Sequence, residues 1–180
     1  MERYFPSFSQ SFISTILIEM IKIYSLELRI IMKIIVDADA CPVKKEIINI
    51  AKEYDLKVLL VMSIAHYSDE QLPSHVEKIY VEKGADRADF KIVQVAKEKD
   101  IVITQDYGLA SLLLPKGSFV IHHLGYEYNH NNIQGLLDQR YLSAMERNAG
   151  KKTKGPKKFT KEKRTDFECF FKKFIEKKKN

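Results

Sequence analysis

The chain has few of the residues that cross-link small folds. Its 180 residues include two cysteines, Cys41 and Cys169, which lie far apart and belong to no CxxC or Cys/His cluster. This scarcity argues against a disulfide framework and against a structural zinc site. The five histidines also lack metal-ligand spacing such as HExxH. A reducing cytoplasm is therefore the expected location.

A long uncharged apolar run is also missing. The segment Phe12–Ile31 is rich in Ile and Leu, but four charged residues interrupt it. A membrane-spanning helix needs about 20 nearly uncharged residues, so we expect no membrane association. The first residues also lack the basic cluster and the cleavage site of a signal peptide. We interpret residues 1–31 as an N-terminal extension, consistent with a misassigned start, of a domain that begins at Met32.

Charge is unevenly distributed along the chain. The formal net charge is +6, and residues 140–180 contain 15 of the 30 Lys and Arg residues but five of the 24 Asp and Glu residues. The rest of the chain is therefore acidic. An acidic body with a basic tail is typical of a protein that holds a polyanion, although a basic tail can also serve solubility alone.

From Met32 onward, short apolar runs alternate with segments of helical periodicity. This alternation predicts βαβ units and a mainly parallel α/β sheet over residues 32–149, followed by a basic loop and a C-terminal helix over residues 150–180 that packs on the domain. The apolar stripe of that last helix is interpreted as core. Strands are expected at 33–37, 57–62, 76–81, 101–104 and 118–122, and helices near Pro42 and at 86–99, 107–114, 131–148 and after Thr160.

Aspartates follow two of these strands and open one helix. Asp37 and Asp39 follow the first strand, Asp106 follows the fourth, and Asp86 and Asp89 begin the helix between them. Ligands bind at the carboxyl ends of parallel strands, and clustered carboxylates repel one another unless a cation is present. Mg²⁺ or Mn²⁺ is the expected cofactor. Helix capping is the alternative, with Asp37 or Asp39 capping the helix near Pro42 and Asp86 capping the next one.

Four segments together resemble a known family. They are GADRADFKI from Gly84, DIVITQDYGLA from Asp100, DADACPV from Asp37 and GKKTKGPKKFT from Gly150. From Met32 onward the chain resembles the YaiI/YqxD family of bacterial proteins, which have a PIN-like domain.

The resemblance implies a three-layer PIN-like fold and, by analogy with PIN nucleases, Mg²⁺- or Mn²⁺-dependent RNA cleavage. It implies that Asp37, Asp89 and Asp106 are catalytic metal ligands and that Asp39 and Asp86 assist them. The pattern departs from many PIN nucleases after the second strand, where Asp69 and Glu70 do not clearly match the expected glutamate.

Nucleic acid, RNA rather than DNA, is the expected partner, and the oligomeric state is left open. Tyr107, Tyr126 and Tyr128 could stack bases if exposed. Two alternatives remain: an RNA-binding protein with a vestigial site, and a haloacid-dehalogenase-type phosphatase that uses Asp37 and Asp39. The candidates for phosphate contact are Arg140, Arg147, Lys151, Lys152, Lys154, Lys157, Lys158 and Arg164.

Overall fold

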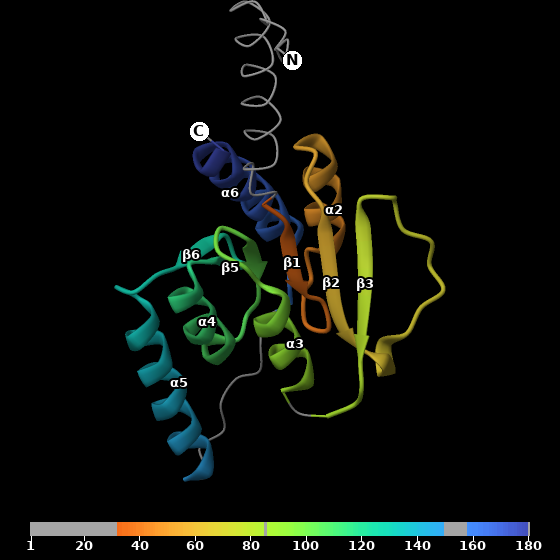
Figure 1. Cartoon of the computed structure of the whole chain (residues 1–180). Helices are drawn as coiled ribbons and strands as arrows, with labels where there is room; N and C mark the ends of the chain where they lie inside the picture. Colours follow the sequence, from red (N-terminus) through yellow and green to blue (C-terminus); the bar gives the residue numbers. More distant parts are fainter. Residues whose placement is uncertain (1–31, 85, 150–157, 180) are drawn as a thin grey trace, which may run out of the picture. The chain divides into compact units, whose positions relative to one another are not determined.

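A six-stranded sheet organises the fold (Figure 1). The computed structural model describes residues 32–84, 86–149 and 158–179. The strand order is β3-β2-β1-β4-β5-β6; the first five strands are parallel, and β6 runs antiparallel to β5. The strands are β1 (Ile34–Asp37), β2 (Val58–Ser63), β3 (Val76–Val81), β4 (Ile101–Ile103), β5 (Phe119–His122) and β6 (Tyr126–Tyr128).

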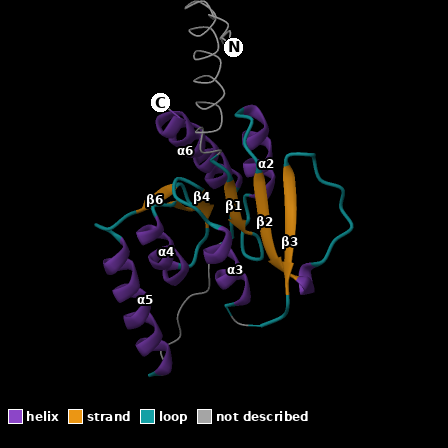
Figure 2. Cartoon of the chain, viewed as in Figure 1, coloured by secondary structure: helices purple, strands orange, loops and turns teal. Residues whose placement is uncertain are grey.

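Helices cover both faces of this sheet (Figure 2). On one face, α2 (Lys44–Glu53) and α6 (Lys161–Lys179) contribute to a shared core with the strands. On the other, α3 (Arg87–Val95) and α4 (Tyr107–Leu113) form a second core, against which α5 (Ile133–Asn148) packs its first turn. The expected three-layer α/β fold of PIN-like type is confirmed. None of the helices in the described residues is long and apolar enough to span a bilayer.

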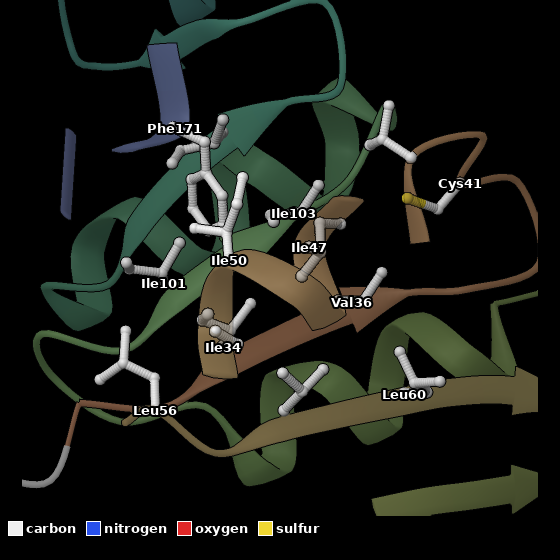
Figure 3. Close-up of a cluster of buried hydrophobic side chains, with 14 of the residues drawn as sticks. Ile34, Val36, Cys41, Ile47, Ile50, Leu56, Leu60, Ile101, Ile103 and Phe171 are labelled. Atoms are coloured by element: carbon white, nitrogen blue, oxygen red, sulfur yellow. The ribbon is translucent and has the colours of Figure 1, made fainter. Parts of the chain in front are cut away.

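The central strand β1 is buried on both faces. Ile34 and Val36 point into the core shared with α2 and α6, whereas Ile35 points into the core shared with α3 and α4. Figure 3 shows Ile34 and Val36 beside Ile47 of α2 and Phe171 of α6. Burial on both faces explains why the strand is a continuous apolar run without polar alternation.

The C-terminal helix supplies aromatic residues to the first core. Phe167, Phe171, Phe174 and Ile175 are buried, which confirms the interpretation of this stripe as core. The Thr160 hydroxyl accepts a 3.4 Å hydrogen bond from the Lys163 N–H, in the manner of an N-cap.

The structure departs from the expected elements at two points. The helix expected to reach Lys99 ends at Val95, and Lys99 has a φ of 66°. The Asp100 carboxylate stabilises this turn because it accepts the Lys97 N–H at 2.9 Å and pairs with Lys33 Nζ at 2.9 Å. The short strand β6, which follows the turn at Gly125, had not been expected.

The strand order fixes where a ligand can bind. The chain builds β1, β2 and β3 toward one edge and then returns to place β4 on the other side of β1. In open α/β sheets, ligands bind at such a reversal, outside the carboxyl ends of the strands. In this protein that point lies beyond Asp37 of β1 and the turn after β4.

Candidate functional site

A cleft of about 370 Å³ opens at the point where the strand order reverses. Asp37 comes from the end of β1, Asp106 from the turn after β4, and Asp89 from the first turn of α3. The structure therefore brings together the three aspartates singled out from the sequence. The cleft is lined by Asp37, Asp89, Gln105, Asp106, Tyr107 and Arg140.

A buried threonine joins the two strand ends. The Thr104 hydroxyl donates to Asp37 Oδ2 at 2.8 Å and accepts from the Asp106 N–H at 3.0 Å. Thr104 is 3% exposed, so this hydroxyl must find partners inside the protein. Thr104 therefore orients the Asp37 carboxylate and holds the backbone of Asp106.

The Asp106 carboxylate caps α4. Its Oδ1 accepts the N–H groups of Gly108 at 2.6 Å and Leu109 at 3.1 Å. A Cβ at position 108 would lie 2.9 Å from that oxygen, so a residue larger than glycine would displace the carboxylate. The turn fixes Asp106 at the cleft.

Arg140 places a fixed positive charge in the cleft. Its Nη1 lies 2.9 Å from Asp106 Oδ1 and 3.0 Å from Oδ2. The Arg140 side chain is 53% exposed, so solvent reaches the guanidinium. The cleft therefore contains three carboxylates and one guanidinium. The guanidinium neutralises part of the negative charge of the carboxylates.

The cleft raises the pKa of two carboxyl groups. Burial raises the pKa of Asp37, the Thr104 hydrogen bond opposes that rise, and the negative charges of Asp39 and Asp106 add to it. Burial, followed by repulsion from Asp37, Asp106 and Asp86, raises the pKa of Asp89 to about 6. Such shifts are typical of functional sites, where like charges are held close together.

The raised pKa of Asp89 predicts that the stability of the metal-free protein depends on pH. Between about pH 4 and pH 6 the folded state binds the Asp89 proton more tightly than the unfolded chain does, so stability falls as pH rises. Because the site is partly solvated, we expect Asp89→Asn to stabilise the protein at pH 7 by only about 1 kcal/mol.

The measurement is thermal unfolding of both proteins in a chelator from pH 4 to pH 7.5. As pH rises across this interval, the variant should become more stable relative to the wild type. The difference in stability should become constant above about pH 7. Parallel stability profiles of the two proteins would show that folding does not raise the pKa of Asp89.

Two of the predicted metal residues lie outside the cleft lining. Asp39 accepts the Ser63 N–H at 2.9 Å and contacts His66 Nδ1 at 2.7 Å. Asp86 is exposed and has a left-handed backbone, with a φ of 60°. Both are near enough to influence the charge of the site, since Asp39 acts on Asp37 and Asp86 acts on Asp89.

The capping alternative was wrong for the residues it named. Helix α2 is preceded by Val43 without a side-chain cap, and Asp86 precedes α3 but forms no capping hydrogen bond. The capping carboxylate is Asp106, at the start of α4. Capping therefore does not account for Asp37 or Asp89.

The donor chemistry of the cleft fits a hard divalent cation bound by two carboxylates. Asp37 and Asp89 offer oxygen atoms, and Asp89 accepts no hydrogen bond from the described residues. Mg²⁺ typically takes one or two carboxylates and fills its shell with water and substrate phosphate. Across the described residues, no group of three or more His, Cys, Asp or Glu side chains is arranged as a metal site.

The three tyrosines proposed for base stacking have different environments. Tyr107 lines the cleft. Tyr128 is buried, and Tyr126 stacks on His122 with ring centroids 4.7 Å apart. Burial lowers the pKa of His122 to about 3, so this histidine is neutral, and its Nδ1 accepts the Leu124 N–H at 2.9 Å. Only Tyr107 of the three is positioned to meet a ligand in the cleft.

The basic residues proposed for phosphate contact also lie in different environments. Arg140 faces the cleft, whereas Arg147 and Lys158 are exposed on the surface. Arg164 is used within the fold, because it pairs with Glu46 at 2.9 Å and donates to the Pro42 carbonyl. The predictions for Lys151, Lys152, Lys154 and Lys157, and for the extension 1–31, lie outside the described residues.

Sequence reasoning missed Gln105 as a cleft residue and did not place Arg140 beside Asp106. Gln105 directly precedes Asp106 in the turn after β4, and that position was an available signal. Arg140 lies 34 residues beyond Asp106 in sequence, on a helix whose packing depends on the whole fold. No local sequence pattern predicts a contact between residues so far apart in the chain.

Comparison with known proteins places the chain in a family. A family model described as "Uncharacterized BCR, YaiI/YqxD family" matches residues 35–177. A UPF0178 protein of Bacillus cereus (strain AH187) is 57% identical over 144 residues, which cover 80% of this chain and 99% of that protein. A UPF0178 protein of Bacillus mycoides (strain KBAB4) is 56% identical over the same shares. No solved structure matches the chain. The chain belongs to the YaiI/YqxD family of uncharacterised proteins.

Proposed function

We propose that the protein is a Mg²⁺- or Mn²⁺-dependent nuclease that hydrolyses RNA phosphodiester bonds in the cleft. The observation that carries this proposal is the meeting of Asp37, Asp89 and Asp106 from three separate elements at the reversal of the strand order. Burial raises the pKa of Asp89 to about 6, and repulsion among the carboxylates of this open cleft adds to the rise and opposes folding. A bound cation would offset this repulsion.

Each cleft residue then has a distinct task. Asp37 and Asp89 would hold the cation, which when bound activates water and neutralises phosphate charge. Thr104 keeps Asp37 oriented through its 2.8 Å hydrogen bond. Asp106 holds the Arg140 guanidinium in the cleft, where it can donate to a non-bridging phosphate oxygen. Tyr107 adds an aromatic side chain to the lining of the cleft.

A non-catalytic RNA-binding protein is the second candidate function. The contact between Arg140 and Asp106 favours it, because the guanidinium neutralises one of the three acids without a metal. The phosphatase alternative has less support. Its second aspartate would be Asp39, which instead contacts Ser63 and His66 and does not line the cleft.

The testing experiment measures cleavage and binding of one labelled single-stranded RNA by the full 180-residue chain. Cleavage should appear on titration with Mg²⁺ or Mn²⁺ and disappear in excess chelator. Binding is measured separately in chelator at low and high salt. Salt-sensitive binding without cleavage at any metal concentration would favour the second function. The absence of both would contradict both functions.

A further inference from the structure

A second groove lies on the other side of α3, between this helix and the end of the edge strand β3. Its volume is about 730 Å³, and it is open to solvent. The candidate catalytic residues do not extend into it. The groove is lined by Tyr80, Val81, Glu82, Arg87, Phe90, Lys91 and Gln94.

Helix α3 contributes to both hollows. Asp89 lines the acidic cleft, whereas the groove side carries residues 87, 90, 91 and 94. Spacings of three, four and seven residues place these four side chains on one helical face. From Arg87 to Gln94 the helix rises about 10 Å, which is the length of about three stacked nucleotides. This side of the helix is therefore long enough for about three nucleotides.

The groove combines an exposed aromatic ring with positive charge. Phe90 is 71% exposed, the largest exposed fraction among the large hydrophobic residues of the described part. Arg87 and Lys91 flank it on the same helical face, and Glu82 is the single acid in the lining. Arg87 forms no ion pair with another described residue, and Lys91 Nζ donates to Gln94 Oε1 at 3.0 Å. Both cations are therefore available to an anionic ligand.

We propose that this groove binds single-stranded nucleic acid, with a base stacked on Phe90 and backbone phosphates at Arg87 and Lys91. The inference rests on the proposed function, since it describes where the substrate continues beyond the cleft. An exposed ring beside cations is how proteins bind unpaired bases without reading their sequence. A duplex keeps its bases stacked inside and offers no face to the ring, so the groove selects single strands.

The absence of tryptophan from the chain allows a direct test. Phe90→Trp introduces a single indole, whose fluorescence is quenched when a base stacks on it. The matched control is Tyr141→Trp, at an aromatic residue that is 66% exposed on α5 and outside both hollows. Each full-length variant is titrated with a single-stranded RNA and with its duplex in chelator. Quenching of Phe90→Trp by the single strand alone is the expected result.

Affinity measurements complete the test. Phe90→Ala should weaken single-strand binding at least about fivefold, and Phe90→Tyr should retain it. Arg87→Gln should reduce the slope of log affinity against log salt by about 0.7.

Failure of the groove inference can be told apart from failure of the nuclease proposal. Unquenched Phe90→Trp with a wild-type protein that still binds and cleaves RNA would overturn the groove but not the activity. Quenching without metal-dependent cleavage would support the groove as a binding site and count against the nuclease. Equal quenching in both tryptophan variants, or RNA binding unchanged in Phe90→Ala and Arg87→Gln, would overturn the inference and leave this edge to a protein partner.

Discussion

Replacing Asp37 with asparagine is expected to reduce RNA cleavage by more than about a hundredfold. Loss of a residue that only orients a metal ligand costs about 10- to 100-fold, so loss of the ligand itself should cost more. The fold should survive, because the substitution removes a negative charge from a crowded cleft where burial and two aspartates already raise the pKa of Asp37. The asparagine oxygen can still accept the hydrogen bond from Thr104.

The measurement compares single-turnover cleavage by wild type and variants at saturating Mn²⁺. Asp106→Asn should lose about 10- to 100-fold, because Asp106 acts by holding Arg140 in the cleft. Asp39→Asn and Asp86→Asn should lose less than about tenfold, since neither residue lines the cleft. Asp138→Asn, on the exposed surface of α5, is the matched control and should cleave as the wild type does. Full cleavage by Asp37→Asn would rule out the proposed site.

The sequence predicts the fold well where hydrophobic pattern alone decides the structure. The strand at Val76–Val81 was predicted with the bounds observed, and the helices after Asp106 and Thr160 began where expected. Prediction failed where tertiary contacts override the pattern. The helical periodicity of α3 continues past Val95, but the turn anchored by Asp100 ends the helix there. The three-residue strand β6 is too short to show a pattern and exists because it pairs with β5.

The candidate site was predictable in part for a similar reason. Strand ends locate Asp37 and Asp106 at one edge of the sheet, and the resemblance adds Asp89. The sequence does not reveal that β1 and β4 are neighbours, which depends on how the whole sheet assembles. The resemblance distinguished Asp89, as a catalytic ligand, from Asp86, as a helper, and in the structure Asp89 lines the cleft whereas Asp86 does not. The sequence also could not show that Arg164, in a basic segment, serves an internal ion pair.

The basic C-terminal segment raises a question that stability measurements can answer. If α6 were only a tail for holding RNA, its aromatic stripe could be altered at little cost. Phe171 is instead fully buried in the core with Ile34 and Ile47. Phe171→Ala is expected to lower the free energy of unfolding by about 3 to 5 kcal/mol, because it removes a buried ring and leaves a cavity. Domains are stable by about 5 to 15 kcal/mol, so the variant should lose a large share of its stability.

Chemical unfolding in urea, followed by far-ultraviolet circular dichroism, measures this loss. Phe90→Ala is the matched control, since the same ring is removed from a site that is 71% exposed, and it should change stability by less than about 0.5 kcal/mol. A small effect of Phe171→Ala would mean that α6 can detach and act as a mobile basic arm. The expected large effect means that α6 is held in place by the core, so its exposed lysines present positive charge at a defined surface of the domain. RNA contact by this helix would then depend on the folded domain.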